Sequence, residues 1–355
     1  MVLLNVMGVE IRTGNLLEAA TDALVNTVNT VGVMGKGIAL QFKQAFPDNF
    51  KAYEAACRRG EVQTGRMFVH ESRALTGPRF IVNFPTKRHW KGRSRIEDIE
   101  AGLEDLAATI HRHGIRSIAV PPLGCGLGGL SWDEVRPRIL KALGGIEGVD
   151  VYLYAPGGAP DADRMPVGTS RPKMTPSVAA LLTVFEHYQV PGYRLGRLEA
   201  QKLAYFLQAV GEPLHLSFRK DRYGPYAEKL NFVLQKLEGH MIRGYGDRSV
   251  QAAIRVLPQV NGEIQAALKG SPETSQRVDR VSKLVQGFET PYGMEILATV
   301  HWLVTQEGVD LRDDELIVRG VGDWNARKAA VFSRQHVLVA AGRLRDLDAA
   351  LHSAG

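Results

Sequence analysis

A glycine-rich loop at residues 121–130 sets narrow limits on how this chain can fold. Four of the six residues from 124 to 129 are glycine, and the apolar segment Ser117–Val120 comes directly before the loop. Ser131 and Glu134 follow with the spacing of a helix-capping box. A loop between a buried strand and a helix N-terminus exposes backbone N–H groups in a partly positive field, which suits phosphate binding. A simple tight turn is the alternative, but it does not need so many glycines.

The surrounding sequence alternates between strand and helix patterns. Strands are expected at residues 2–5, 9–12, 23–28, 65–70, 79–84, 117–120 and 149–154, with helices at 37–46, 47–59, 94–110 and after 131. Pro85 is expected to end its strand because proline cannot donate to a ladder. Ser94 and Glu97 form a second capping-box pattern. This alternation predicts a mostly parallel sheet covered by helices on both faces.

Lys87 lies just beyond the strand 79–84, in the segment Asn83-Phe84-Pro85-Thr86-Lys87. Ligands of open α/β sheets bind beyond the carboxyl ends of the strands, so a lysine at this position is well placed to meet one. Basic residues follow it closely, so a solvated lysine in a basic loop is an equally good interpretation of this segment alone.

Two asparagines, Asn26 and Asn29, interrupt the apolar strand 23–28 at its end. The loop Val31–Gly37 follows with three glycines. Asparagines at a strand end either close a turn through their side chains or bind sugar hydroxyls, and the sequence alone hardly separates these roles.

Two nucleotide-binding fingerprints fit poorly. Gly124-x-Gly126-x-x-Gly129 matches the dinucleotide motif, and Asp150 lies about 20 residues further on. In a Rossmann unit, however, the acid follows the second strand, whereas Asp150 precedes the strand that ends the alternation. The segment Gly35-Lys36-Gly37 lacks the spacing and the hydroxyl residue of a P-loop.

The loops and the strand-terminal asparagines together resemble a macrodomain, the ADP-ribose-binding fold. Residues 25–47, 83–90 and 121–132 are similar to the macrodomain of DarG-type antitoxins, which remove ADP-ribose from DNA bases modified by a DarT toxin. The resemblance implies a three-layer α/β/α macrodomain with a mixed sheet at residues 1–155. It also implies that Lys87 is catalytic. The residues it implies for ADP-ribose binding are Asn15, Asn26, Asn29, Val31, Gly35, Lys36, Gly37, Thr86, Gly124, Cys125, Gly126, Leu127, Gly128, Gly129 and Tyr154.

One position departs from the pattern of many macrodomains. Asn15 follows Gly14 where those domains place the aspartate that binds the adenine amino group. An amide oxygen can still accept that hydrogen bond but loses the charge assistance, so looser adenine selectivity is expected.

The resemblance leaves the role of Lys87 open between a nucleophile at the anomeric carbon and a cation that stabilises the departing base. A nucleophilic lysine must be neutral, so its pKa would have to be lowered by desolvation or by a nearby cation, which Arg88 and Lys91 could supply.

Arg88, His89 and Trp90 also form a basic aromatic turn that could hold single-stranded DNA by stacking and phosphate contact. Trp90 could equally be a buried core residue.

The second half of the chain is predicted to be a mainly α-helical domain at 177–355, after a Gly- and Pro-rich linker at 156–176. Among its expected helices are residues 251–257 and a single long helix at 324–343. The segments 201–206, 223–226 and 238–240 resemble the C-terminal half of DarG proteins, which implies a cognate DarT-like toxin as partner. Residues 1–155 hold 19 Lys and Arg against 16 Asp and Glu, and the rest holds 25 against 22. Each half therefore has a net charge of +3. This balance gives no bulk support for mimicry of the toxin's DNA strand, which the resemblance associates with inhibition of the toxin and which would suit an acidic face.

Composition restricts the remaining possibilities. The 355 residues are 45% hydrophobic and 23% charged, without a membrane-spanning run or a signal peptide, so a cytoplasmic protein without membrane contact is expected. Two cysteines cannot form a metal cluster by themselves, and no cofactor or metal is expected. The sequence thus predicts a glycohydrolase acting on ADP-ribosylated single-stranded DNA, with thymidine as the expected base. A macrodomain that binds ADP-ribose without cleaving it is the alternative.

Overall fold

The computed structural model describes residues 4–6, 8–72, 76–157, 160–189, 192–246 and 253–352, with side chains omitted at 4–6 and 347–352. It divides into two compact units, one formed by Met1–Ser170 with Gly246–Ser249 and the other by Arg171–Tyr245 with Val250–Gly355. No helix in the described part of the chain is long and apolar enough to cross a membrane.

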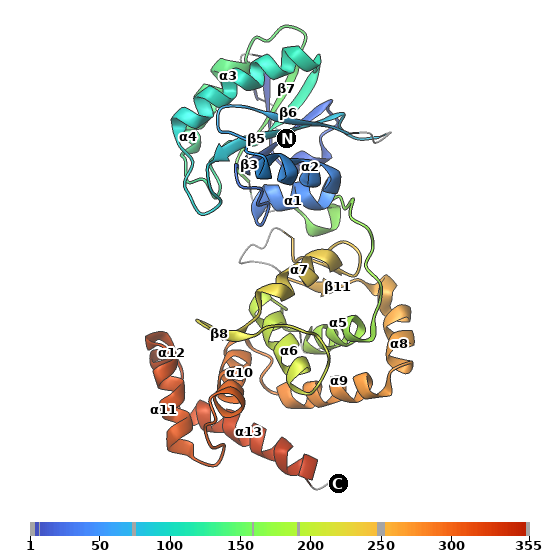
Figure 1. Cartoon of the computed structure of the whole chain (residues 1–355), viewed down its shortest axis with the longest axis vertical. Coiled ribbons are helices and arrows are strands. Elements are labelled where there is room, and N and C mark those ends of the chain that lie inside the picture. The colour runs from blue at the N-terminus through green and yellow to red at the C-terminus, as the bar shows by residue number, and fades with distance from the viewer. Residues whose placement is uncertain are drawn as a thin grey trace. The chain divides into compact units, whose positions relative to one another are not determined.

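A seven-stranded mixed sheet forms the centre of the first unit (Figure 1). Its strand order is β1-β2-β7-β6-β3-β5-β4. The inner pairings are parallel, whereas the edge pairs β1–β2 and β4–β5 are antiparallel. The strands are β1 Leu4–Val6, β2 Val9–Arg12, β3 Ala23–Asn29, β4 Phe68–Glu71, β5 Phe80–Lys87, β6 Ser117–Val120 and β7 Asp150–Tyr154.

Helices cover both faces of this sheet, which confirms the predicted three-layer α/β/α macrodomain (Figure 1). The helices are α1 Gly37–Ala45, α2 Pro47–Arg58, α3 Ile96–His113 and α4 Trp132–Leu143. Successive strand residues alternate between the two cores. Val25 and Val82 pack with α3 and α4, whereas Leu24 and Ile81 pack with α1.

The prediction that Pro85 ends its strand was wrong, because β5 continues to Lys87. The N–H of Phe80 points to the β3 side, where it donates to Asp22, and the carbonyl of Arg79 accepts from Ser72 on the β4 side. By this alternation the nitrogen of Pro85 faces the β4 side, where the ladder ended at Asn83. The missing donor therefore costs no ladder hydrogen bond.

The two predicted capping boxes do not form. Helix α3 begins at Ile96 with Arg95 as its N-cap, and the hydroxyl of Ser94 is buried without a hydrogen-bond partner among the described residues. Ser131 is the N-cap of α4, but its side chain makes no capping bond. The glycine loop accounts for the missing cap at Ser94, because the backbone N–H of Ser94 donates to the carbonyl of Gly128 in that loop.

The second unit is mainly helical, as predicted (Figure 1). Its helices are α5 Pro176–Gln189, α6 Arg197–Ala209, α7 Glu228–Leu237, α8 Asn261–Lys269, α9 Pro272–Val285, α10 Pro291–Gln306, α11 Asp314–Trp324, α12 Ala326–Val331 and α13 Arg334–His352. Two small hairpins accompany them, β8 Arg219–Asp221 with β9 Gly224–Tyr226, and β10 Ile242–Arg243 with β11 Arg255–Val256.

Two helix predictions in this unit were wrong. The segment predicted as a helix at 251–257 contains strand β11, and its first two residues lie outside the described part. The helix predicted at 324–343 is broken twice. Asn325 is extended and its side chain accepts from the N–H of Lys328, and Ser333 accepts from the N–H of His336. Both side chains cap a new helix start, a role that asparagine and serine favour.

Candidate functional site

Three segments meet at the carboxyl edge of the sheet in the first unit. Asn29 at the end of β3 is the register partner of Lys87 at the end of β5. The ammonium of Lys87 donates a hydrogen bond to the backbone carbonyl of Leu127, in the loop between β6 and α4, at 2.5 Å. The structure therefore joins the predicted lysine to the predicted phosphate loop.

Lys87 is half-buried, and desolvation lowers its pKa below the usual lysine range. Of the two causes suggested from the sequence, this is desolvation and not a neighbouring cation. Arg88 forms an ion pair with Asp98 at 2.8 Å. No carboxylate within the described ranges pairs with the ammonium of Lys87, so burial can favour its neutral form.

The glycine loop is shaped by close packing at two of its members. A Cβ at Gly128 would lie 2.2 Å from the carbonyl oxygen of Gly124 and 2.4 Å from the hydroxyl of Ser94. Gly124 also has a positive φ of 72°. The backbone N–H groups of Gly126 and Leu127 have no acceptor in the described part of the chain. These amides, beside the N-terminus of α4, can donate to a phosphate.

Cys125 lies in the same loop, and burial raises the pKa of its thiol to about 11. The thiol is therefore protonated at neutral pH and is a poor nucleophile. Among the described residues, no three His, Cys, Asp or Glu side chains gather in a way that could hold a metal ion.

The loop from Val31 to Gly37 forms the second side of the site. The side-chain oxygen of Asn29 accepts from the N–H groups of Val31 and Val33, and its nitrogen donates to the carbonyl of Val33. Asn29 thus closes the turn, one of the two roles predicted for it. The amide nitrogen carries a second N–H, which could donate to a ribose hydroxyl while these bonds remain. Gly35 lies in this loop and Lys36 is the N-cap of α1. A Cβ at Gly37 would lie 3.6 Å from Leu127, so the two loops face each other.

Asn26 lies apart from these groups, on the face of the sheet below the site. It is fully buried and donates to Asn83, which in turn donates to Asn49 of α2 at 2.7 Å. The structure does not bring its side chain to Lys87. The sequence did not identify Asn83 and Asn49 as buried polar residues. Asn83 is the register partner of Asn26 on the neighbouring strand β5.

Asn15 and Tyr154 gather around Met165 at the other end of the sheet edge. The side-chain oxygen of Asn15 accepts from Leu17 at 3.1 Å, and its nitrogen lies 3.6 Å from the sulfur of Met165. Tyr154 ends β7 and is buried in the cluster that includes Met165. Met165 was not identified from the sequence, because it lies in the segment predicted to be a linker.

Thr86 is buried directly before Lys87. Its hydroxyl donates to the carbonyl of Val28 at 3.4 Å. This contact ties the ends of β3 and β5 together, so Thr86 supports the position of Lys87.

The turn after Lys87 presents aromatic side chains to solvent. His89 and Trp90 stack with ring centroids 5.5 Å apart, and the ammonium of Lys91 lies 4.9 Å from the Trp90 ring. Trp90 is 49% exposed, which excludes the alternative that it is a core residue. The exposed valines Val31 and Val33 and the 66% exposed Leu127 add apolar surface near Lys87.

Comparisons with known proteins agree with this architecture. A family model described as Macro domain matches residues 25–139. The solved structure of the Thermus aquaticus DarG macrodomain is 60% identical and covers 41% of this chain and 97% of that chain, with a TM-score of 0.40. A Thermosipho africanus protein named DNA ADP-ribosyl transferase-DNA ADP-ribosyl glycohydrolase fusion protein is 37% identical over 40% of each chain.

The evidence for the family comes from a match over nearly the whole chain. A Thermus aquaticus protein named DNA ADP-ribosyl glycohydrolase is 53% identical over 327 residues, which are 92% of this chain and 90% of the relative. This chain therefore belongs to the family of DNA ADP-ribosyl glycohydrolases.

Proposed function

We propose that the first unit hydrolyses the N-glycosidic bond between ADP-ribose and a base of single-stranded DNA, with thymidine as the base. The glycine loop 124–129 and the loop 31–37 hold the diphosphate, and Lys87 acts at the anomeric carbon of the distal ribose. Asn15 and Tyr154 contact the adenosine end. The names of relatives that match nearly the whole chain support the reaction class.

The observation that carries this proposal is the position of Lys87 between the two loops. Its ammonium reaches the carbonyl of Leu127, and its strand position faces Asn29. A protein that only binds ADP-ribose needs amides and a shaped cleft for the phosphates, but it needs no half-buried lysine at the ribose.

The test is release of ADP-ribose from a single-stranded oligonucleotide that carries ADP-ribosyl-thymidine. Wild type should release it, whereas Lys87→Ala should bind ADP-ribose but lose release by at least about 100-fold, the usual scale for one catalytic group. Lys141→Ala is the matched control, because it removes an exposed lysine from the last turn of α4, away from both loops of the site.

A non-catalytic ADP-ribose reader is the second candidate. If wild type and Lys87→Ala both bind ADP-ribose and neither releases it from any modified base, the first unit is a reader. Release from a modified guanosine but not from thymidine would correct the base and keep the enzyme.

The turn at Arg88, His89 and Trp90 is proposed to hold the DNA strand beside the modified base. The exposed indole offers a stacking surface, and Lys91 lies against it. One nitrogen of Arg88 is paired with Asp98, and the other N–H groups of its exposed guanidinium can donate to a phosphate.

The second unit is proposed to bind and neutralise a cognate DarT-like toxin. Support comes from the fusion of transferase and glycohydrolase in one related chain, which places the two activities side by side. Residues 174–355 alone should retain a DarT-like protein in a pull-down, and residues 1–170 should not. Absence of binding by the second unit and by the full chain would refute the partner.

A further inference from the structure

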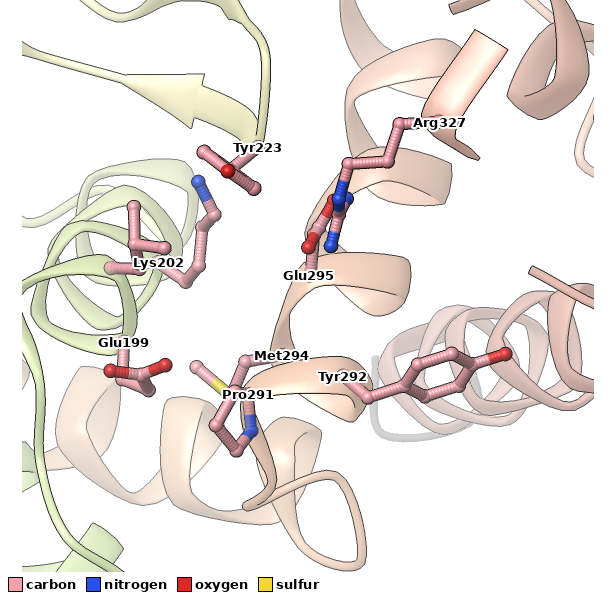
Figure 2. A pocket seen from close by; sticks show the side chains of 9 residues that line it. Glu199, Lys202, Tyr223, Pro291, Tyr292, Met294, Glu295 and Arg327 are labelled. Carbon is pink, nitrogen blue, oxygen red and sulfur yellow. The ribbon is translucent and has the colours of Figure 1, made fainter. Parts of the chain in front are cut away.

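The second unit contains a pocket of about 180 Å³, built from α6, the turn between β8 and β9, α10 and α12 (Figure 2). Lys202 and Tyr223 lie on one side of it, and Glu295 and Arg327 lie on the other. Its volume is below the roughly 300–1,000 Å³ of sites for drug-sized ligands. It has room for an inorganic anion or a small organic acid.

Lys202 is the unusual member of this lining. It is only 2% exposed, and among the described residues its ammonium donates to one partner, the carbonyl of Pro225 at 2.7 Å. An ammonium has three donors, so two remain for another acceptor. No carboxylate in the described part of the chain lies within ion-pair distance of Lys202. A buried charge left in this way is costly unless something else pairs with it.

The neighbouring cations show what a fully paired group in the same cluster looks like. Lys328 is completely buried and donates to Glu295 at 2.5 Å and to Thr299 at 3.0 Å. Arg327 also donates to Glu295, at 2.7 Å. Glu295 therefore binds two cations of α12 through its Oε1, and it makes no hydrogen bond or ion pair with Lys202.

The local field around Lys202 also favours an added negative charge. Burial and the charge of Lys328 lower the pKa of Lys202 to about 7. The acidic groups that face it are Glu199 of α6, Asp221 of β8 and Glu295 of α10, and these do not offset the effect. The phenol of Tyr223 and the guanidinium of Arg327 complete the surroundings. An anion in the pocket would stabilise the charged form of Lys202.

We propose that this pocket is an anion-binding site in which Lys202 and Arg327 hold a carboxylate or a phosphate-type group. The apolar wall formed by Leu198 and Met294 accommodates the body of a small organic acid. This inference does not depend on the proposed reaction of the first unit, because every group that carries it belongs to the second unit.

Isothermal titration of the full chain with sulfate and with propionate tests the proposal. Sulfate represents a tetrahedral anion whose charge is constant between pH 6 and 9, and propionate represents a carboxylate with a short apolar body. Lys202→Gln keeps a donor for Pro225 but removes the charge, and it should weaken binding by about tenfold or more, as expected for a charge-assisted contact. Lys229→Gln is the matched control, because this lysine is exposed on α7 of the same unit.

The pH dependence provides a second readout. Wild-type affinity for sulfate should fall as the pH rises from 6 to 9, because the neutral amine cannot pair with the anion, and the profile of Lys202→Gln should be flat. If Lys202→Gln does not fold, Arg327→Gln is the second test variant, because the Arg327 side chain is 33% exposed. It should weaken anion binding by the same factor. Binding of sulfate alone or propionate alone supports the site and identifies its ligand class. The proposal is overturned if wild type binds neither anion, or if the folded pocket variants bind them like wild type.

Discussion

Lys87 combines two properties that a nucleophilic amine needs. Burial lowers its pKa, and no carboxylate among the described residues stabilises its charge. Within the described residues its one side-chain hydrogen bond goes to the neutral carbonyl of Leu127, so a ligand that displaces this carbonyl would leave the amine directed into the site. A lysine that acts only as a cation would instead gain from an acidic neighbour.

The pH profile should therefore rise with pH. The neutral form of Lys87 becomes populated as the pH approaches a pKa below the ordinary value of 10.5, so kcat/KM for ADP-ribose release should increase and then level off there. Borohydride should trap a covalent adduct in wild type. Lys87→Arg is the control, because it keeps a cation but cannot form an imine. A rate that falls with increasing pH, without a trapped adduct, would assign Lys87 the cationic role.

Trp90 provides a second prediction for a single residue. Trp90→Ala should raise KM for the modified oligonucleotide by about tenfold, within the roughly 1–3 kcal/mol that stacking of one base on an aromatic ring contributes. Binding of free ADP-ribose should not change, because the indole projects into solvent beyond the site. Equal KM values for both proteins would remove Trp90 from the DNA-contacting turn.

The glycine loop shows at the scale of an element why particular positions need glycine. Gly124 and Gly128 pack against each other and against Ser94, whereas Gly126 has open space around it. The backbone of this loop must therefore change shape if a side chain is added at 128.

Gly128→Ala should lower the thermal midpoint of the first unit and weaken ADP-ribose binding at least tenfold, because its Cβ would overlap the carbonyl of Gly124. The expected cost is about 1–3 kcal/mol, the typical effect of overpacking. Gly126→Ala should leave the thermal midpoint unchanged. The argument fails if both variants melt and bind alike.

Helix α10 contains a histidine that links stability to pH. His301 packs edge-on against the rings of Tyr205 and Phe206, and its Nδ1 lies 2.8 Å from the hydroxyl of Tyr205. Burial lowers the pKa of His301 to about 4 from an ordinary value of 6.5. The unfolded chain therefore takes up this proton more readily than the folded chain does.

The second unit should lose stability as the pH falls from about 6.5 toward 4, because protonation of His301 favours the unfolded state. His301→Gln removes the titrating group and should reduce the drop in thermal midpoint between pH 7 and pH 5. An identical drop in both proteins would assign the acid sensitivity to other groups.

At the scale of the whole molecule, each of the two units has its own hydrophobic core. One large cluster belongs to the helical unit, and the other clusters lie on the two faces of the sheet. A unit with its own core can melt independently.

Calorimetry of the full chain should resolve two transitions, and ADP-ribose should raise only one of them. A ligand that binds one folded unit stabilises that unit by mass action. Residues 1–170 alone should show the ligand-sensitive transition. One transition that shifts as a whole would mean that the units unfold together.

The sequence by itself determined the order of elements and the chemistry of the loops. Alternating apolar patterns predict the strands and helices of the first unit, and glycine density predicts the loop before α4, because periodicity and turn preference are local properties. The position of Lys87 at the end of a strand is local in the same sense. Pro85 was misjudged because its effect depends on which neighbouring strand its nitrogen faces.

Only the tertiary structure decided which polar groups meet. Asn26 and Asn29 are three residues apart, yet one joins the buried contacts of Asn83 and the other closes a loop. Lys202 and Arg327 are separated by 125 positions in the numbering, and no local pattern connects them across their pocket. Contacts between distant segments depend on how whole elements pack, so the charge of a buried lysine and its partners can be read only from the folded chain.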